Sequence, residues 1–386
     1  MRIGVVVALL AGLALVADAA KAAGPRFVMH RIGNFRSEAC CVADFNGDGK
    51  PDVLAGEYLY IAPDWKAVKI RTLKGSVDEQ GKGYRWDFGN LPMDVDGDGQ
   101  PDLISVDWFD KRAVWLRNIG AEKGEWPTTI IEVNGNFETA GLYDLLGGGH
   151  APVVVPAVAP TVWYEPDGKG AFTKHVVSTN ALPFGVGVGD INGDGRPDII
   201  RPAAWYAAPA DPRNGAWSEH PIALGSKEGR ADHTSQHLVF DVNGDGLNDI
   251  VTSSAHKYGI FWYEQVRHST EITFTQHVID DSWSQAHSLA LADLDGCGLP
   301  ELITGKRFMA HNGKDPDENG PLGVYYYKLQ RHPDRTVTWT KHIISYNQGI
   351  GAGLNICVAD VNGDGRLDII VTGKWGGPVW FENQAQ

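Results

Sequence analysis

Acidic nine-residue segments are the part of this 386-residue sequence best suited to chemistry. Five copies follow the pattern D-x-[DN]-x-D-G-x-x-D, which places oxygen-bearing side chains at positions 1, 3, 5 and 9. Hard oxygen ligands at this density select Ca²⁺ over softer metals, and the glycine permits a sharp turn. We therefore predict about five structural calcium ions. Their predicted ligands are Asp44, Asn46, Asp48 and Asp52; Asp94, Asp96, Asp98 and Asp102; Asp190, Asn192, Asp194 and Asp198; Asp241, Asn243, Asp245 and Asp249; and Asp360, Asn362, Asp364 and Asp368.

Two further copies depart from this pattern. The segment DLDGCGLPE from Asp293 has Cys297 at position 5, where the pattern requires an oxygen, so we expect weak calcium binding there. The segment DLLGGGHAP from Asp144 has lost most of its carboxylates, and we expect it to bind no ion. The alternative for the intact copies is a metal-free turn rich in Asp and Asn, but five regularly spaced copies argue against it.

The spacing of these segments predicts the fold. They begin at residues 44, 94, 144, 190, 241, 293 and 360, a period typical of four-stranded propeller blades. Apolar runs flank each segment, so each should be the turn of a hairpin, followed by an aromatic third strand and an outer strand containing His. The last repeat lacks its outer strand, and residues 27–32 carry the missing pattern. We predict an all-β, single seven-bladed β-propeller over residues 26–386, closed by the N-terminal strand.

The two ends and the overall charge indicate where such a protein works. Residues 1–22 begin with a basic residue, continue with a short apolar run and end in small residues. This pattern predicts a secretory signal peptide cleaved near Ala19 or Ala22, with a buried N-terminal helix as the alternative. We expect a secreted or periplasmic protein without a membrane span. The formal charge of −14 argues against nucleic-acid binding, and the sequence indicates no oligomeric state.

With these acidic loops the chain resembles the FG-GAP/VCBS-type repeat family, the calcium-looped seven-bladed propellers that include integrin α-subunit heads. The resemblance implies the fold and the calcium, while the family includes adhesion modules, sugar binders and lyases. The polar ring described below, with its W-x-x-H-x-I strand, is loosely similar to the propeller of aldos-2-ulose (anhydrofructose) dehydratases. That similarity implies a zinc site and elimination from a keto-sugar, although the cupin domains of those enzymes are absent here.

Chain direction separates the calcium loops from a second set of polar residues. The starts of the innermost strands and the ends of the second strands should surround a central funnel on the opposite face. Loops on such a scaffold commonly carry function. Imidazoles gathered with carboxylates suit Zn²⁺ or general acid–base catalysis. We predict His237, His256 and His287 as ligands of a funnel metal, with Glu138 or Asp87 as fourth ligand or base. Alternatively, these imidazoles hydrogen-bond in a wet polar channel.

The remaining funnel residues are candidates for catalysis and substrate binding. For catalysis they are Lys306 and Arg307, which would stabilise an enolate, with His233, His311, Glu138 and Asp87. For substrate binding they are Arg85, Trp86, Trp108, Gln236, Asn355, Lys374 and Trp375. Blade packing is the alternative for the tryptophans, and a solvated rim for the basic residues. The predicted function is metal-assisted β-elimination on a keto-sugar or uronate, with a non-catalytic glycan- or protein-binding propeller as the alternative.

Cys40 and Cys357 fall on the innermost strands of the first and last predicted blades, which are neighbours in a closed ring. A disulfide between them would lock the closure, and an exported protein would permit it. Ordinary buried thiols are the alternative, which we favour.

Overall fold

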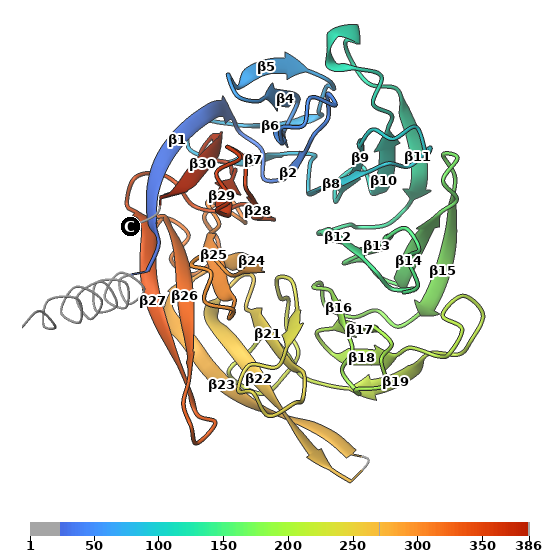
Figure 1. Ribbon diagram of the computed structural model, residues 1–386, viewed down its shortest axis with the longest axis vertical. Coiled ribbons are helices and arrows are strands. Elements are labelled where there is room, and N and C mark those ends of the chain that lie inside the picture. Colours follow the sequence, from blue (N-terminus) through green and yellow to red (C-terminus); the bar gives the residue numbers. More distant parts are fainter. Residues whose placement is uncertain (1–23, 270, 385–386) are drawn as a thin grey trace, which may run out of the picture.

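The computed structural model describes residues 24–269 and 271–384, so the predicted signal peptide lies outside the described residues. Seven four-stranded antiparallel sheets form a ring around a central axis (Figure 1). This arrangement confirms the predicted all-β, seven-bladed propeller. The short helix η1 (Ala121–Lys123) and the two-stranded sheet of β6 (Gly75–Val77) and β7 (Gly83–Arg85) lie outside the blades. Within the described ranges, none of the helices is long and apolar enough to cross a membrane.

The blades follow the chain, and the first strand of each lies innermost. Blade 1 contains β2 (Cys40–Ala43), β3 (Asp52–Ala55), β4 (Tyr58–Ile61) and β5 (Lys66–Lys69), and blade 2 contains β8 (Gly89–Met93), β9 (Asp102–Asp107), β10 (Arg112–Leu116) and β11 (Thr128–Val133). Blade 3 contains β12 (Ala140–Tyr143), β13 (Val153–Pro156), β14 (Thr161–Pro166) and β15 (Phe172–Ser178), and blade 4 contains β16 (Gly187–Gly189), β17 (Asp198–Arg201), β18 (Ala204–Ala207) and β19 (Ser218–Pro221).

The last three blades continue the same order. Blade 5 contains β20 (Leu238–Phe240), β21 (Asp249–Ser253), β22 (Tyr258–His268) and β23 (Glu271–Ser284), and blade 6 contains β24 (Ala286–Ala292), β25 (Glu301–Lys306), β26 (Gly323–Arg331) and β27 (Val337–Tyr346). Blade 7 contains β28 (Cys357–Ala359), β29 (Asp368–Val371), β30 (Gly377–Gln384) and, from the other end of the chain, β1 (Arg26–Phe35).

The N-terminal strand closes the ring as predicted. The blue β1 lies beside the red β30 in Figure 1, and the two strands pair antiparallel with His30 opposite Trp380. Blades 1 and 7 also approach each other at their innermost strands, where Sγ of Cys40 lies 3.7 Å from Sγ of Cys357. Both cysteines are thiols in this structure.

The repeated histidines of the outer strands pack against the aromatic residues of the third strands. The ring of His175 stacks on Trp163 with centroids 3.8 Å apart, and His220 stacks on Trp205 at 4.1 Å. The same arrangement recurs for His30 on Trp380, His277 on Trp262, and His342 on Tyr326. These five histidines are therefore packing residues, which separates them from the histidines of the funnel.

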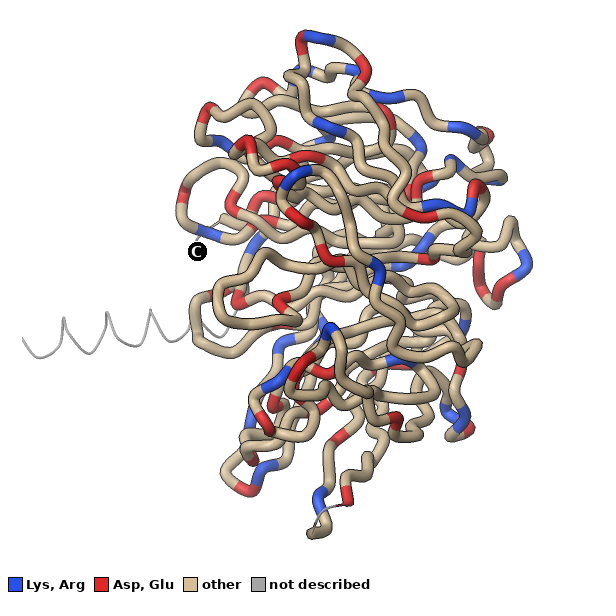
Figure 2. The backbone as a smooth tube through the Cα atoms, turned by 90° about the vertical axis from the view of Figure 1, so that its right-hand side faces the viewer, with Lys and Arg blue, Asp and Glu red and all other residues tan. Residues whose placement is uncertain are grey.

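Apolar residues fill the spaces between neighbouring blades. One such core joins blades 2 and 3 through Val106, Trp115, Phe137 and Val154, all of which are buried. Burying apolar surface on this scale is the main driving force for folding. Basic and acidic residues are interspersed over the outside of the ring (Figure 2). The ring is thus a packed scaffold whose loops differ between its two faces.

Candidate functional site

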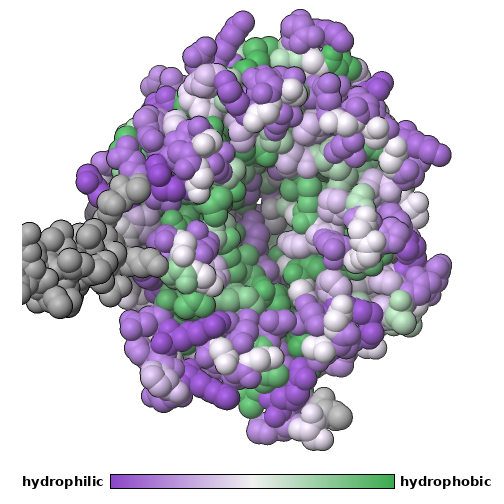
Figure 3. Space-filling model, viewed as in Figure 1, coloured by the Kyte–Doolittle hydropathy of each residue, from purple (hydrophilic) through white to green (hydrophobic). Residues whose placement is uncertain are grey.

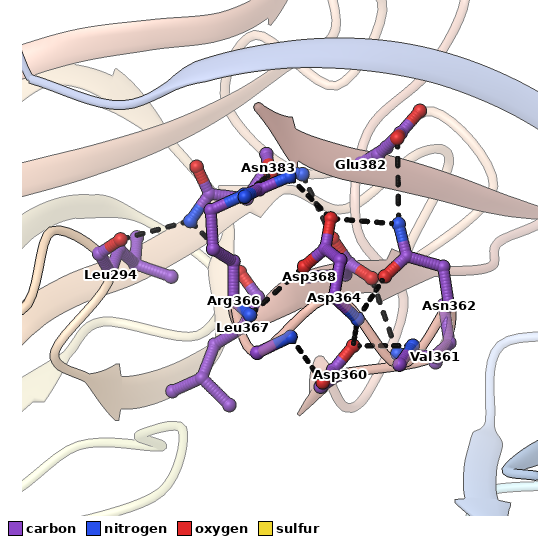
Figure 4. Close-up of polar contacts among 12 residues, drawn as sticks. Leu294, Asp360, Val361, Asn362, Asp364, Arg366, Leu367, Asp368, Glu382 and Asn383 are labelled. Carbon is purple, nitrogen blue, oxygen red and sulfur yellow. Dashed lines mark hydrogen bonds and ion pairs between the residues drawn. The ribbon is translucent and has the colours of Figure 1, made fainter. Parts of the chain in front are cut away.

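The acidic loops connect the first and second strands of the blades and share one hydrogen-bonding pattern. In the loop shown in Figure 4, Oδ1 of Asp360 accepts the N–H of Gly363 at 2.8 Å and that of Asp364 at 3.1 Å. Oδ2 of Asp360 accepts the N–H of Gly365 at 2.8 Å. The loops that begin at Asp44, Asp94, Asp190 and Asp241 repeat these three bonds. The backbone therefore wraps around the first carboxylate and fixes its direction.

The aspartate at position 9 of each intact loop has a second, structural use. Asp368 is fully buried, and its Oδ2 accepts the N–H of Val361 at 3.2 Å while its Oδ1 accepts that of Asn383 at 2.8 Å. In the other four blades, Oδ1 of the position-9 aspartate accepts the backbone N–H of Ala62, Asn118, Ala208 or Gln265. This carboxylate therefore connects the hairpin turn to the end of the third strand, a role that the sequence analysis did not predict.

The donor set of the intact loops fits a hard cation. Carboxylate oxygens of Asp94, Asp96 and Asp102 all lie within 4.8 Å of one another. Burial, together with the like charges of Asp48 and Asp44, raises the pKa of Asp52 to about 6, although two backbone N–H groups oppose the shift. A bound cation would relieve this unfavourable concentration of charge.

The two degenerate loops are visibly different. In the loop from Asp293, Cys297 lies beside Asp293 and Asp295, and the Nζ of Lys328 lies 2.5 Å from Oδ2 of Asp295. Of the three bonds to the first aspartate, the loop from Asp144 shows the one from the N–H of Gly147. Both therefore depart from the donor arrangement of the five intact loops.

A cavity of about 380 Å³ lies on the opposite face, between inner-strand starts and second-strand ends. Figure 3 looks onto the acidic-loop side of the ring and shows a hollow at its centre with hydrophobic residues around it, so the cavity itself lies on the far side of that view. The cavity wall combines aromatic side chains with imidazole, carboxylate and guanidinium groups. The lining residues are Tyr84, Phe88, Trp108, Phe109, Glu138, Phe184, His233, His256, Arg307, Ala310 and His311.

Glu138, His256 and His287 converge beside this cavity, with one ligand atom of each within 4.8 Å of the others. Glu138 precedes β12, His256 follows β21 and His287 lies in β24, so blades 3, 5 and 6 each supply one residue. Nε2 of His287 lies 3.2 Å from Oε1 of Glu138. Nδ1 of His256 and Nε2 of His287 are buried and have no aligned hydrogen-bond partner among the described residues. Two imidazoles and one carboxylate form a donor set that suits Zn²⁺ or Fe²⁺.

The protonation states of this cluster also fit a cation. Burial alone would raise the pKa of Glu138, but contact with His287 and the charge of Arg307 lower it to about 2. Burial and the charge of Arg307 lower the pKa of His287 to about 4, although Glu138 opposes the shift. At neutral pH the carboxylate is therefore charged and this imidazole is neutral, which are the forms that bind metals.

The comparisons with known proteins concern the repeats and the fold. Residues 144–200 and 241–304 match the model described as FG-GAP-like repeat, and residues 352–382 match the FG-GAP repeat model. The chain carries FG-GAP-like repeats. No curated protein matches the sequence.

Solved structures extend the similarity of fold to nearly the whole chain. A crystal structure of BBS1N in complex with ARL6DN, soaked with mercury, is 9% identical with a TM-score of 0.54, covering 93% of this chain and 96% of that one. The same complex soaked with lead is 10% identical with a TM-score of 0.51, covering 92% and 98%. At this identity the likeness shows the fold alone.

Within this propeller, two of the predicted metal ligands lie apart from the cluster. His237 is buried with Nε2 2.7 Å from Oγ1 of Thr234 and Nδ1 3.2 Å from the carbonyl oxygen of Ile200. Asp87 is buried in an ion pair with Arg71 at 2.8 Å. The predicted trio of histidines is therefore not assembled, because the side chain of His237 turns into the contact between blades 4 and 5. Glu138 stands beside His256 and His287 instead.

Cationic side chains of the predicted site are held by other partners. Arg307 lies in the cavity wall but pairs with both carboxylate oxygens of Glu38, at 2.7 and 3.2 Å. Nζ of Lys306 contacts Asp317, and Nζ of Lys374 donates to the carbonyl oxygen of Met309 at 2.7 Å. The predicted enolate-stabilising role of Lys306 therefore has no support in the cavity geometry.

Among the predicted substrate-binding residues, Trp108 lines the cavity. Arg85 donates to backbone carbonyls of its own hairpin, Trp86 stacks on Phe109 outside the lining, and Trp375 lies under Arg31. Gln236 bonds to Leu354 and Leu289, and Asn355 bonds to the backbone of Cys40. Gln236 and Asn355 therefore connect blades, and Arg85, Trp86 and Trp375 contact other parts of the ring outside the cavity lining.

Two histidines of the predicted catalytic set line the cavity with defined tautomers. Nδ1 of His233 accepts the N–H of Phe184 at 3.2 Å, so the proton of the neutral ring is on Nε2. Nδ1 of His311 lies 2.8 Å from Oδ1 of Asp315, an acceptor, which places the proton of a neutral His311 on Nδ1. His233 therefore offers a donor at Nε2, and His311 offers a lone pair at Nε2.

The sequence analysis missed two parts of this site. Tyr84, Phe88 and Phe109 complete the aromatic wall, although their hairpin and loop have no periodic pattern that marks them. Asp315 lies in the insertion 308–321, the long connection between β25 and β26, whose length was the available signal. The identity of the carboxylate that contacts the histidines followed only from the three-dimensional arrangement.

Proposed function

We propose that this protein is an exported, calcium-stabilised propeller that holds a divalent transition metal in its funnel and eliminates water from a neutral keto-sugar. The observation that carries the proposal is the convergence of Glu138, His256 and His287, with Nε2 of His287 buried and lacking an aligned partner, beside a cavity lined by aromatic residues. A divalent ion held there would supply a Lewis acid that polarises a carbonyl oxygen. FG-GAP-like repeats are typical of extracellular proteins, which supports export.

The surrounding residues have protonation states that suit an elimination. Nε2 of His311 would take the proton from the carbon next to the carbonyl, while Asp315 holds the opposite side of the ring. Nε2–H of His233 would donate to the departing hydroxyl oxygen. The C–H and C–O bonds break, a C=C bond forms and one water molecule leaves. The proton that His311 takes then passes to the departing oxygen, which His233 holds by a hydrogen bond, so both imidazoles return to their neutral forms.

The charges around the cavity favour a neutral substrate over a uronate. Arg307 contributes the guanidinium of the cavity wall, and Glu38 already holds it in a bidentate pair. Lys306 and Lys374 are buried and bond to Asp317 and Met309. A substrate carboxylate would have to displace one of these contacts. A sugar without a carboxylate needs only hydrogen bonds and the stacking that Trp108 and its aromatic neighbours offer.

The aromatic wall also supports a second candidate, a non-catalytic glycan-binding propeller. Trp108, Phe109 and Phe184 line the cavity and could contact sugar faces without any chemistry. The two candidates differ in their need for a metal, because stacking alone requires none.

Metal content and product formation together test the proposal. The protein is purified with calcium, loaded with Zn²⁺, Mn²⁺ or Fe²⁺, and incubated with keto-sugars while ultraviolet absorbance reports a conjugated enone. We expect one transition metal per chain and a product with the preferred metal. His256→Ala should abolish both, whereas His220→Ala, which alters a histidine stacked on Trp205, should abolish neither. Protein that binds glycans but no transition metal would instead support the binding propeller.

A further inference from the structure

We propose that Asp315 is a positioning residue that orients His256 and His311 together, so that the metal centre and the base depend on one carboxylate of the 308–321 insertion. This inference rests on the proposed function. It identifies which part of the chain assembles the site, and it concerns a residue outside the predicted ligand and catalytic sets.

The geometry around Asp315 carries the inference. Its Oδ1 lies 2.8 Å from Nδ1 of His311, and its Oδ2 lies 3.3 Å from Nδ1 of His256. The two imidazole rings stack with centroids 4.3 Å apart and planes at 27°. Oδ2 of Asp315 and Nδ1 of His256 are both buried, and neither has an aligned partner among the described residues. Each is therefore the nearest available partner for the other.

The contacts with Asp315 determine which nitrogen of each imidazole carries the proton. A neutral imidazole has one N–H and one lone pair, whereas an ionised carboxylate only accepts hydrogen bonds. Asp315 is therefore an acceptor that favours the Nδ1–H form of both rings. The lone pair of each Nε2 is then free, in His256 for a metal and in His311 for a proton.

Residues other than Asp315 hold the insertion 308–321 in place. The role of Asp315 in orienting the histidines can therefore be tested separately from the folding of the insertion. Glu318 is buried and accepts the N–H of His311 at 2.6 Å and that of Asp315 at 2.8 Å. The N–H of Gly83 in the β6–β7 hairpin donates to Oδ1 of Asn312 at 2.9 Å. Neither contact uses the carboxylate of Asp315. Its removal should therefore alter the imidazoles while the insertion stays seated.

Asp315→Asn tests the inference through metal affinity rather than activity. We expect Zn²⁺ to bind about 10–100-fold more weakly in competition with a chromophoric chelator. The ligand-field absorption of bound Co²⁺ should change as well. Asp315→Glu, which keeps the carboxylate, should recover part of the affinity. Asp317→Asn is the matched control, because it removes the same charge from the same insertion at a position 39% exposed and paired with Lys306. It should bind as the wild type does.

The tautomers provide a measurement that needs no variant. Long-range ¹H–¹⁵N spectra of the metal-free wild-type protein should show His256 and His311 protonated at Nδ1, and finding them protonated at Nε2 would overturn the inference. Wild-type affinity in a folded Asp315→Asn protein would overturn it too, while leaving the proposed function intact. Wild-type protein that binds no transition metal would instead refute the proposed function itself.

Discussion

The loop face and the funnel face of this propeller are built in different ways. On the loop face, five blades repeat the same bonds, as in the three N–H groups around Asp360. On the funnel face each blade contributes something different, such as Glu138 from blade 3 and His256 from blade 5. Repetition serves stability, because each of these five blades uses the same turn. A catalytic or metal-binding site needs different side chains close together. A ring of blades can supply them because each blade can carry different residues at its funnel end.

Removing calcium should change the stability of the protein more than any other test of the two faces. Chelation leaves several carboxylates close together in each intact loop, and like charges at such distances are unfavourable. Each site bound at a hundredfold excess over its Kd contributes about 2.7 kcal/mol, so we expect Tm to fall by about 10 °C or more. Scanning calorimetry with and without chelator measures this, and added Ca²⁺ should restore Tm. An unchanged Tm would show that the loop face is stable without metal.

Replacing the aspartate at position 9 of an intact loop should have the next largest effect on stability. Asp198→Ala leaves the buried N–H groups of Ile191 and Ala208 without their acceptor. Unsatisfied buried groups cost about 1–3 kcal/mol each, so we expect the free energy of unfolding to fall by about 3 kcal/mol in urea titrations. Asp144→Ala, in the degenerate loop, is the control and should cost less than about 1 kcal/mol. Equal losses would remove the distinction between intact and degenerate loops.

The fold was predictable because its signals are local and repeated. The period of the acidic segments fixed the blade count, and residues 27–32 matched the strand missing from the last repeat. The ligand set was not predictable, because no local pattern tells whether a rim side chain turns inward. His237 and His287 look equivalent in sequence, yet His237 turns toward the carbonyl of Ile200 and His287 toward Glu138.

Titration of Lys374 on the funnel face should have a smaller effect on stability. Burial and the charge of Arg307 lower the pKa of Lys374 to about 8, although Glu38 opposes the shift. The unfolded chain then binds more protons than the folded one between pH 8 and about 10.4, so stability rises with pH across that window. The penalty is fully present below pH 8 and amounts to at most about 3 kcal/mol.

Lys374→Met should remove this dependence. Its free energy of unfolding should lack the gain that the wild-type protein shows between pH 8 and about 10.4, which urea titrations at both ends of the window would reveal. Other titrating groups are common to both proteins and cancel in the difference. Parallel curves for the two proteins would mean that the ammonium of Lys374 is not strained in its contact with Met309.

Glu138→Gln should have the smallest effect on stability and a large one on metal binding. The substitution removes a charge 3.2 Å from His287 and 3.8 Å from Arg307, but Arg307 keeps its bidentate pair with Glu38. No buried charge is left without a partner, so the free energy of unfolding should change by less than about 1 kcal/mol. Transition-metal affinity should fall at least about tenfold, since an anionic ligand is lost. The contrary result would be a loss of stability as large as that of Asp198→Ala with unchanged metal affinity. Glu138 would then be a structural carboxylate like those of the loops, and the two faces would no longer differ in function.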